Sequence, residues 1–74
     1  MKVIEHNKLL DLINAEFAKL PDYDQSIKVI EVSLNRITGE LTFFPNVTDS
    51  RIFDFRNYLT QVGYKFNGQY EKII

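Results

Sequence analysis

Residues 26–45, SIKVIEVSLNRITGELTFFP, decide the fold class because they predict two strands joined by a tight turn. The segment 26–35 is rich in β-branched residues and alternates apolar with polar side chains, and 40–44 continues in the same style. The residues between them, 36–39, end in Gly39, which suits the left-handed position of a four-residue hairpin loop. We therefore predict an antiparallel hairpin.

The alternation also predicts the register of this hairpin. A four-residue loop sets Leu34 opposite Leu41 and Val32 opposite Phe43, with Ile30 on the same apolar face, whereas a three-residue loop pairs apolar with polar side chains. The opposite face is then not fully polar, and it supplies our candidate protein interface. This interface consists of Ile27, Val29, Glu31, Thr42 and Phe44. A helix packed on that side, or a bulge near Val29, would instead return its apolar members to the core.

Helical periodicity flanks the hairpin on both sides. Over residues 3–20 the apolar side chains recur every three or four positions, and Pro21 cannot continue the pattern. A second helix is predicted over 49–62, with Thr48 as its N-cap and Gly63 as a left-handed C-terminal cap. Both helices are amphipathic and need a sheet or another helix to cover their apolar sides.

The C-terminal segment predicts a second hairpin. Asn67-Gly68 is the dipeptide most favoured in two-residue hairpin turns, and it is flanked by the strand-like segments 64–66 and 69–73. A single strand with a bulge at the glycine is the alternative. The order helix, hairpin, helix, hairpin packs most simply as a two-layer α+β domain, in which both helices lie on one face of an antiparallel sheet of three or four strands.

The length of 74 residues leaves room for one hydrophobic core, so residues 1–74 are expected to form a single domain. The absence of cysteine excludes disulfide bonds and thiolate metal sites. Stability must then come from packing or from association, and a homodimer is one expectation. Richness in Ile, Asn, Lys, Phe and Tyr is typical of AT-rich genomes, such as those of many phages and low-GC bacteria.

Neither a secretory signal nor an apolar stretch of membrane-spanning length occurs in the sequence, so we expect a cytoplasmic protein without membrane contact. Catalytic motifs are also missing. The one histidine, His6, has no serine nearby in the sequence, and the glycines do not cluster as a phosphate-binding loop. Asp22 and Asp24 are typical of a turn and lack the further ligands of a calcium loop. We expect no enzyme, cofactor or metal site.

The formal net charge of -1 argues against a general phosphate-binding surface, but residues 51–74 carry four basic and two acidic side chains. Aromatic rings can stack on unpaired bases while Lys and Arg contact phosphates. The candidate residues for single-stranded nucleic acid are Arg56, Tyr58, Tyr64, Lys65, Tyr70 and Lys72. Against this reading, so small a domain also needs one or two of these tyrosines in its core.

Elimination leaves two hypotheses for function. The first is a small intracellular binding module that acts by protein–protein contact, as a regulator or inhibitor of a larger macromolecule, with another protein or a second copy as partner. Its contact would use the sheet surface and a strand edge. The second is a module for single-stranded nucleic acid.

Overall fold

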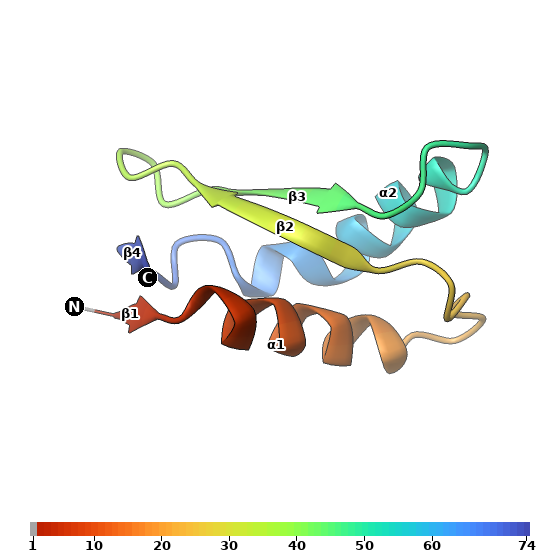
Figure 1. Cartoon of the computed structure of the whole chain (residues 1–74), viewed down its shortest axis with the longest axis horizontal. Helices are drawn as coiled ribbons and strands as arrows, with labels where there is room; N and C mark the ends of the chain where they lie inside the picture. Colours follow the sequence, from red (N-terminus) through yellow and green to blue (C-terminus); the bar gives the residue numbers. More distant parts are fainter. Residues whose placement is uncertain (1) are drawn as a thin grey trace.

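Two helices and two small β-sheets form the α+β fold of residues 2–74, the part of the chain that the computed structural model describes (Figure 1). The elements in chain order are β1 (Val3–Ile4), α1 (His6–Ala18), β2 (Val29–Leu34), β3 (Leu41–Pro45), α2 (Ile52–Val62), the 3-10 helix η1 (Gly63–Lys65) and β4 (Lys72–Ile73). Strands β2 and β3 are antiparallel, whereas β1 and β4 are parallel. The α+β class is therefore confirmed, and the single antiparallel sheet of three or four strands is wrong.

The register of the β2–β3 hairpin agrees with the prediction at its loop end. Leu34 lies opposite Leu41, and Val32 lies opposite Phe43. Gly39 closes the four-residue loop with a φ of 78°, in the left-handed region that glycine tolerates without a steric cost. Local turn chemistry and alternation together were enough to predict this end of the hairpin.

The other end of the hairpin contains a β-bulge. Val29 lies opposite Pro45 and Glu31 lies opposite Phe44, so Ile30 is an extra residue in β2. The bulge reverses the side-chain directions expected from strict alternation: Val29 is 2% exposed and belongs to the core, whereas Ile30 is 56% exposed. The predicted placement of Ile30 on the core face is wrong for this reason.

Both helices are shorter than predicted. Helix α1 begins at His6, after its N-cap residue Glu5, because Val3 and Ile4 form β1, which pairs with β4. Helix α2 begins at Ile52, and the carboxylate of Asp49, not the hydroxyl of Thr48, accepts the backbone N–H of Arg51 at 2.9 Å. Gly63 has a φ of -58° and continues into η1, so the predicted left-handed cap is wrong.

The predicted second hairpin does not form. The amide oxygen of Asn67 accepts the backbone N–H of Leu41 at 2.9 Å, and the N–H of Gly68 donates to the carbonyl of Gly39 at 2.9 Å. The Asn67-Gly68 turn is thus attached to the first hairpin. The chain then runs on to β4, where Lys72 and Ile73 pair with β1.

The hairpin lies over α1 and α2, and the helices and strands share one core (Figure 1). Phe17 is at its centre, with ring centroids 5.9 Å from Phe55, 5.6 Å from Tyr58 and 6.3 Å from Tyr23. Within residues 2–74 no charged side chain is buried, and neither helix is long and apolar enough to cross a membrane. Groups that act on other molecules therefore lie at the surface.

Candidate functional site

The predicted protein interface is divided by the bulge. Ile27 is 0% exposed and Val29 is 2% exposed, so these two core residues are wrong as surface candidates. Glu31, Thr42 and Phe44 are exposed as predicted. The sequence alone could not separate the buried residues from the exposed ones. Alternation of side chains with a period of two places all five on one face, and this holds only when the strand contains no bulge.

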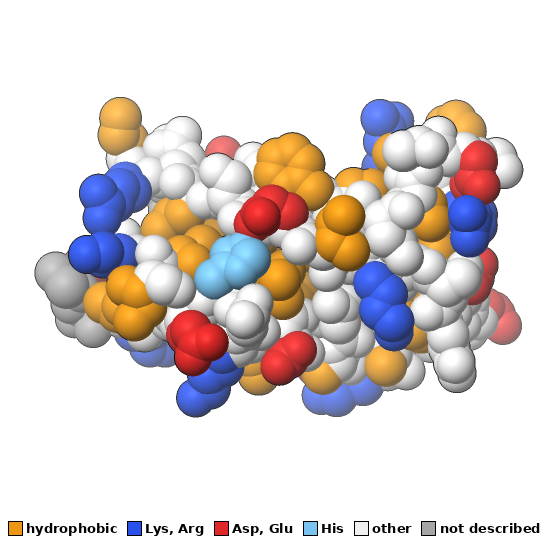
Figure 2. Space-filling model, viewed as in Figure 1, with side chains coloured by type: hydrophobic (Ala, Val, Ile, Leu, Met, Phe, Trp, Pro, Cys, Tyr) orange, Lys and Arg blue, Asp and Glu red, His pale blue; other side chains and the backbone are white. Residues whose placement is uncertain are grey.

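The outer face of the hairpin exposes Phe44 and Ile30 close to Glu31. Nε2 of His6, on the first turn of α1, bonds to the Glu31 carboxylate. This contact raises the pKa of His6 and lowers the pKa of Glu31, since each charged form stabilises the other. Figure 2 shows the imidazole in pale blue beside an acidic side chain, with hydrophobic side chains around the pair.

One part of the outer edge of β2 is closed by helix α1. The side-chain amide of Asn14 donates to the carbonyl of Val29 at 3.0 Å and accepts its N–H at 2.9 Å. Asn14 therefore takes the place of a neighbouring strand at this residue. Opposite Val29, on the other side of β2, stands Pro45, which has no N–H to offer.

The other part of the same edge is open. Asn35 donates its N–H to the carbonyl of Glu40 at 2.8 Å, so this pair is hydrogen-bonded across the hairpin. Because antiparallel pairs alternate, the backbone groups of Leu34 and Val32 point away from β3. The N–H of Val32 is accepted by the Glu31 carboxylate at 2.9 Å. The open edge therefore consists of the N–H and C=O of Leu34, which is half-buried, and the C=O of Val32, which is 5% exposed; none of these groups has a strand partner within residues 2–74.

A shallow groove of about 220 Å³ lies along this open edge. Its lining consists of Val32, Leu34, Arg36, Lys72 and Ile73. Its apolar surface comes from β2 and β4, and its two cations come from the hairpin loop and from β4. Within residues 2–74 no carboxylate forms an ion pair with either cation. In Figure 2 basic side chains stand at the left end of the molecule, with hydrophobic side chains beside them.

The six candidates for nucleic-acid binding do not all reach the surface. Tyr58 is a core residue, 6% exposed, whose hydroxyl accepts the N–H of Asp24 at 3.0 Å. It cannot stack on a base, so the prediction is wrong for this residue. Tyr70 is half-buried against the core.

The remaining four candidates are exposed but have different surroundings. Lys65 donates to the Glu16 carboxylate at 2.8 Å, and Lys19 and Lys65 together lower the pKa of Glu16 to about 2. Arg56 lies on α2 and Tyr64 on η1, whereas Lys72 lines the groove. The structure thus places Lys72 in the same groove as a second cation, Arg36, which the sequence did not suggest.

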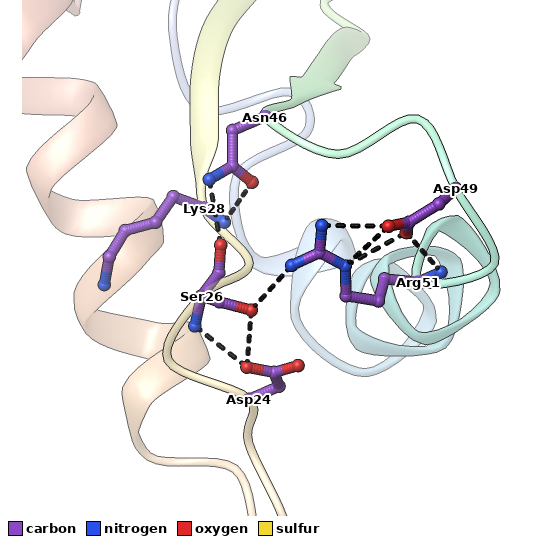
Figure 3. Close-up of polar contacts among 6 residues, drawn as sticks. All are labelled: Asp24, Ser26, Lys28, Asn46, Asp49 and Arg51. Carbon is purple, nitrogen blue, oxygen red and sulfur yellow. Dashed lines mark hydrogen bonds and ion pairs between the residues drawn. The ribbon is translucent and has the colours of Figure 1, made fainter.

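A polar network joins the loop before β2 to the loop after β3 (Figure 3). The Arg51 guanidinium bonds to Asp49 at 2.9 Å and donates to the Ser26 hydroxyl at 3.1 Å. Ser26 in turn donates its N–H and its hydroxyl to Asp24, at 2.9 and 2.7 Å. These bonds lower the pKa values of Asp24 and Asp49. Their partners lie within the chain, so we assign the network to loop closure.

In the described part of the chain, no group of three or more His, Asp or Glu side chains is arranged to hold a metal ion. No protein-family model, curated protein or solved structure matches the chain. Open backbone groups and exposed apolar side chains lie on the hairpin, and Arg36 and Lys72, which have no ion pair within residues 2–74, line the groove between the hairpin and β4, so this region is the candidate site.

Proposed function

We propose that this protein is a small protein-binding module that takes up an extended segment of another protein on its hairpin. The observation that carries the proposal is the open edge of β2, defined above by the backbone groups of Leu34 and Val32, on the same hairpin as the exposed side chains of Ile30 in β2 and Phe44 in β3. Unpaired strand edges readily accept a further strand, whose main-chain hydrogen bonds supply affinity. Apolar side chains beside the edge supply contact area. A module of this kind regulates a larger protein by holding one of its segments.

The length of the open edge favours a segment of another protein over a second copy of the chain. Asn14 occupies the backbone groups of Val29, and Glu31 occupies the N–H of Val32, so of the outward groups of Val29, Val32 and Leu34 three remain without a partner in the described part of the chain. Two copies that joined through β2 would each offer this same short edge. A flexible segment can also follow the groove and the outer face, which two rigid hairpins cannot do at once.

A peptide selection tests the proposal. The full chain is immobilised and challenged with a display library of random peptides, and enriched peptides are then measured against variants. Phe44→Glu is expected to weaken their binding about tenfold or more, which corresponds to about 1.4 kcal/mol. Phe53→Glu is the matched control, because Phe53 is 69% exposed but lies on α2, and it should leave binding unchanged. Circular dichroism must show that both variants are folded.

Two results would overturn the proposal. Selected peptides that bind Phe44→Glu as tightly as the parent chain would remove the hairpin from the contact. Light scattering that shows a dimer broken by Phe44→Glu would assign the same surface to a second copy of the chain, not to a segment of another protein.

A further inference from the structure

The groove beside the open edge of β2 holds two cations that come from distant parts of the chain. Arg36 belongs to the hairpin loop and Lys72 to β4, and both are exposed. Some cations elsewhere are paired, such as Arg51 with Asp49 and Lys65 with Glu16, whereas others, such as Arg56, form no ion pair within residues 2–74. Arg36 and Lys72 form no such pair within residues 2–74, although they share one small groove.

The backbone of β2 would orient a peptide segment that binds in this groove. An added strand that bonds to the N–H and C=O of Leu34 would lie along the apolar floor formed by Val32, Leu34 and Ile73. Side chains in neighbouring strands approach each other directly and along the diagonal, so a side chain near the Leu34 position of the added strand can reach Arg36. Lys72 lines the same groove from β4. A carboxylate placed there would lie between two positive charges.

We infer that the partner segment carries an aspartate or glutamate side chain, held between Arg36 and Lys72 while its backbone pairs with Leu34. This inference rests on the proposed function and adds the chemistry of the partner. Arg36 offers a planar fork of donors that matches a carboxylate, and Lys72 adds a point charge. The formal net charge of the chain is -1, so the attraction to an acidic segment is local to the groove.

Synthetic peptide pools test the inference. Each pool consists of short acetylated and amidated peptides with a mixture of Val, Ile, Thr and Ser at all positions but the central one. The central residue is Glu in the first pool, Gln in the second and Lys in the third, and the chain ends carry no charge. Affinity is measured against the full chain by fluorescence polarisation. We expect the Glu pool to bind about five- to tenfold more tightly than the Gln pool, and the Lys pool to bind most weakly.

Variants and salt locate the effect. The double variant Arg36→Glu with Lys72→Glu should reverse the order of the Glu and Lys pools, whereas Arg56→Glu, an exposed cation on α2, should not change it. The difference between the Glu and Gln pools should shrink in about 0.5 M NaCl, since exposed charges are then screened.

Hydrogen exchange separates the inference from the proposed function. Bound peptide should slow the exchange of the Leu34 amide, which points away from β3. If the Glu and Gln pools both protect Leu34 and bind equally well, the acidic preference is wrong and strand addition stands. If no pool protects Leu34, the strand-addition model and the inference both fail. If an oligothymidylate binds in place of the Glu pool and is lost in the double variant, the cations serve phosphates and the inference is wrong.

Discussion

Asn14 closes one part of the β2 edge, and its replacement by alanine tests how much the fold depends on that closure. The variant removes both partners of the Val29 backbone, the donor at 3.0 Å and the acceptor at 2.9 Å. Val29 itself is a core residue, so water has poor access to these groups. A buried backbone group left without a partner costs about 1 to 3 kcal/mol.

The expected loss of stability follows from these terms. Two such groups without partners would lower the free energy of unfolding by about 2 to 6 kcal/mol. The higher helix propensity of alanine offsets this loss by up to about 0.7 kcal/mol. Partial relaxation of the edge towards water reduces the larger value, so we expect Asn14→Ala to lower the free energy of unfolding by about 2 to 4 kcal/mol. A domain of this size has a total of roughly 4 to 11 kcal/mol. The change is therefore a large share of the whole.

Urea unfolding followed by circular dichroism measures the effect. With a slope of about 1 kcal/mol per molar urea, the midpoint should fall by about 2 to 4 M at an unchanged slope. Asn14→Asp keeps an acceptor for the Val29 N–H but loses the donor, so its loss should be at least that of one bond. Asn57→Ala, on an exposed part of α2, is the matched control and should be neutral or slightly stabilising. A loss below about 0.5 kcal/mol in Asn14→Ala would refute the assigned role.

The remaining predictions concern the bulge and the ion pair beside it. Val29→Ala should cost about 1 to 3 kcal/mol in urea unfolding, whereas Ile30→Ala should stay within about 0.5 kcal/mol, and the reverse order would contradict the bulge. The raised pKa of His6 makes its bond to Glu31 stabilising below the ordinary histidine value of 6.5, and this stabilisation is lost as pH rises through the folded-state pKa. The lowered pKa of Glu31 acts in the other direction, adding stability above its ordinary value of 4.5 that is lost on acidification through its folded-state pKa. The difference in urea midpoint between the parent chain and His6→Gln should thus be largest near about pH 5.5 and small near about pH 8.5, and a difference that does not change with pH would show that the charged form of the pair contributes nothing to stability.

Local signals in the sequence were sufficient for the two helices and for one end of the hairpin. The pairing of Leu34 with Leu41 follows from alternation and from the left-handed glycine at position 39. Both depend on residues a few positions apart, which physical rules for turns and strands describe well. The helices follow from periodicity, although their ends shift by a few residues where caps and neighbouring strands intervene.

A bulge near Val29 was one of the alternatives for the hairpin and is confirmed at Ile30, but the same rules could not choose it over regular alternation. An extra residue in a strand has no periodic signature, and the backbone groups of Val29 beside it bond to Asn14, which belongs to another element. The consequence for function was large, because Ile27 and Val29 moved from the predicted surface to the core. Phe44 is exposed as predicted because its partner Glu31 lies between the bulge and the hairpin loop, where the pairing is regular.

The sequence by itself determined the α+β class, the two amphipathic helices and the register at the loop end of the hairpin, since each depends on patterns within a short stretch. Tertiary structure alone decided the pairing of β1 with β4 and the groove that unites Arg36 with Lys72. Strands of two residues are too short to carry a periodic signal, and they pair only because the core brings the chain ends together. The candidate site thus consists of long-range contacts, which form only when apolar burial in the core outweighs the entropy lost in closing the chain.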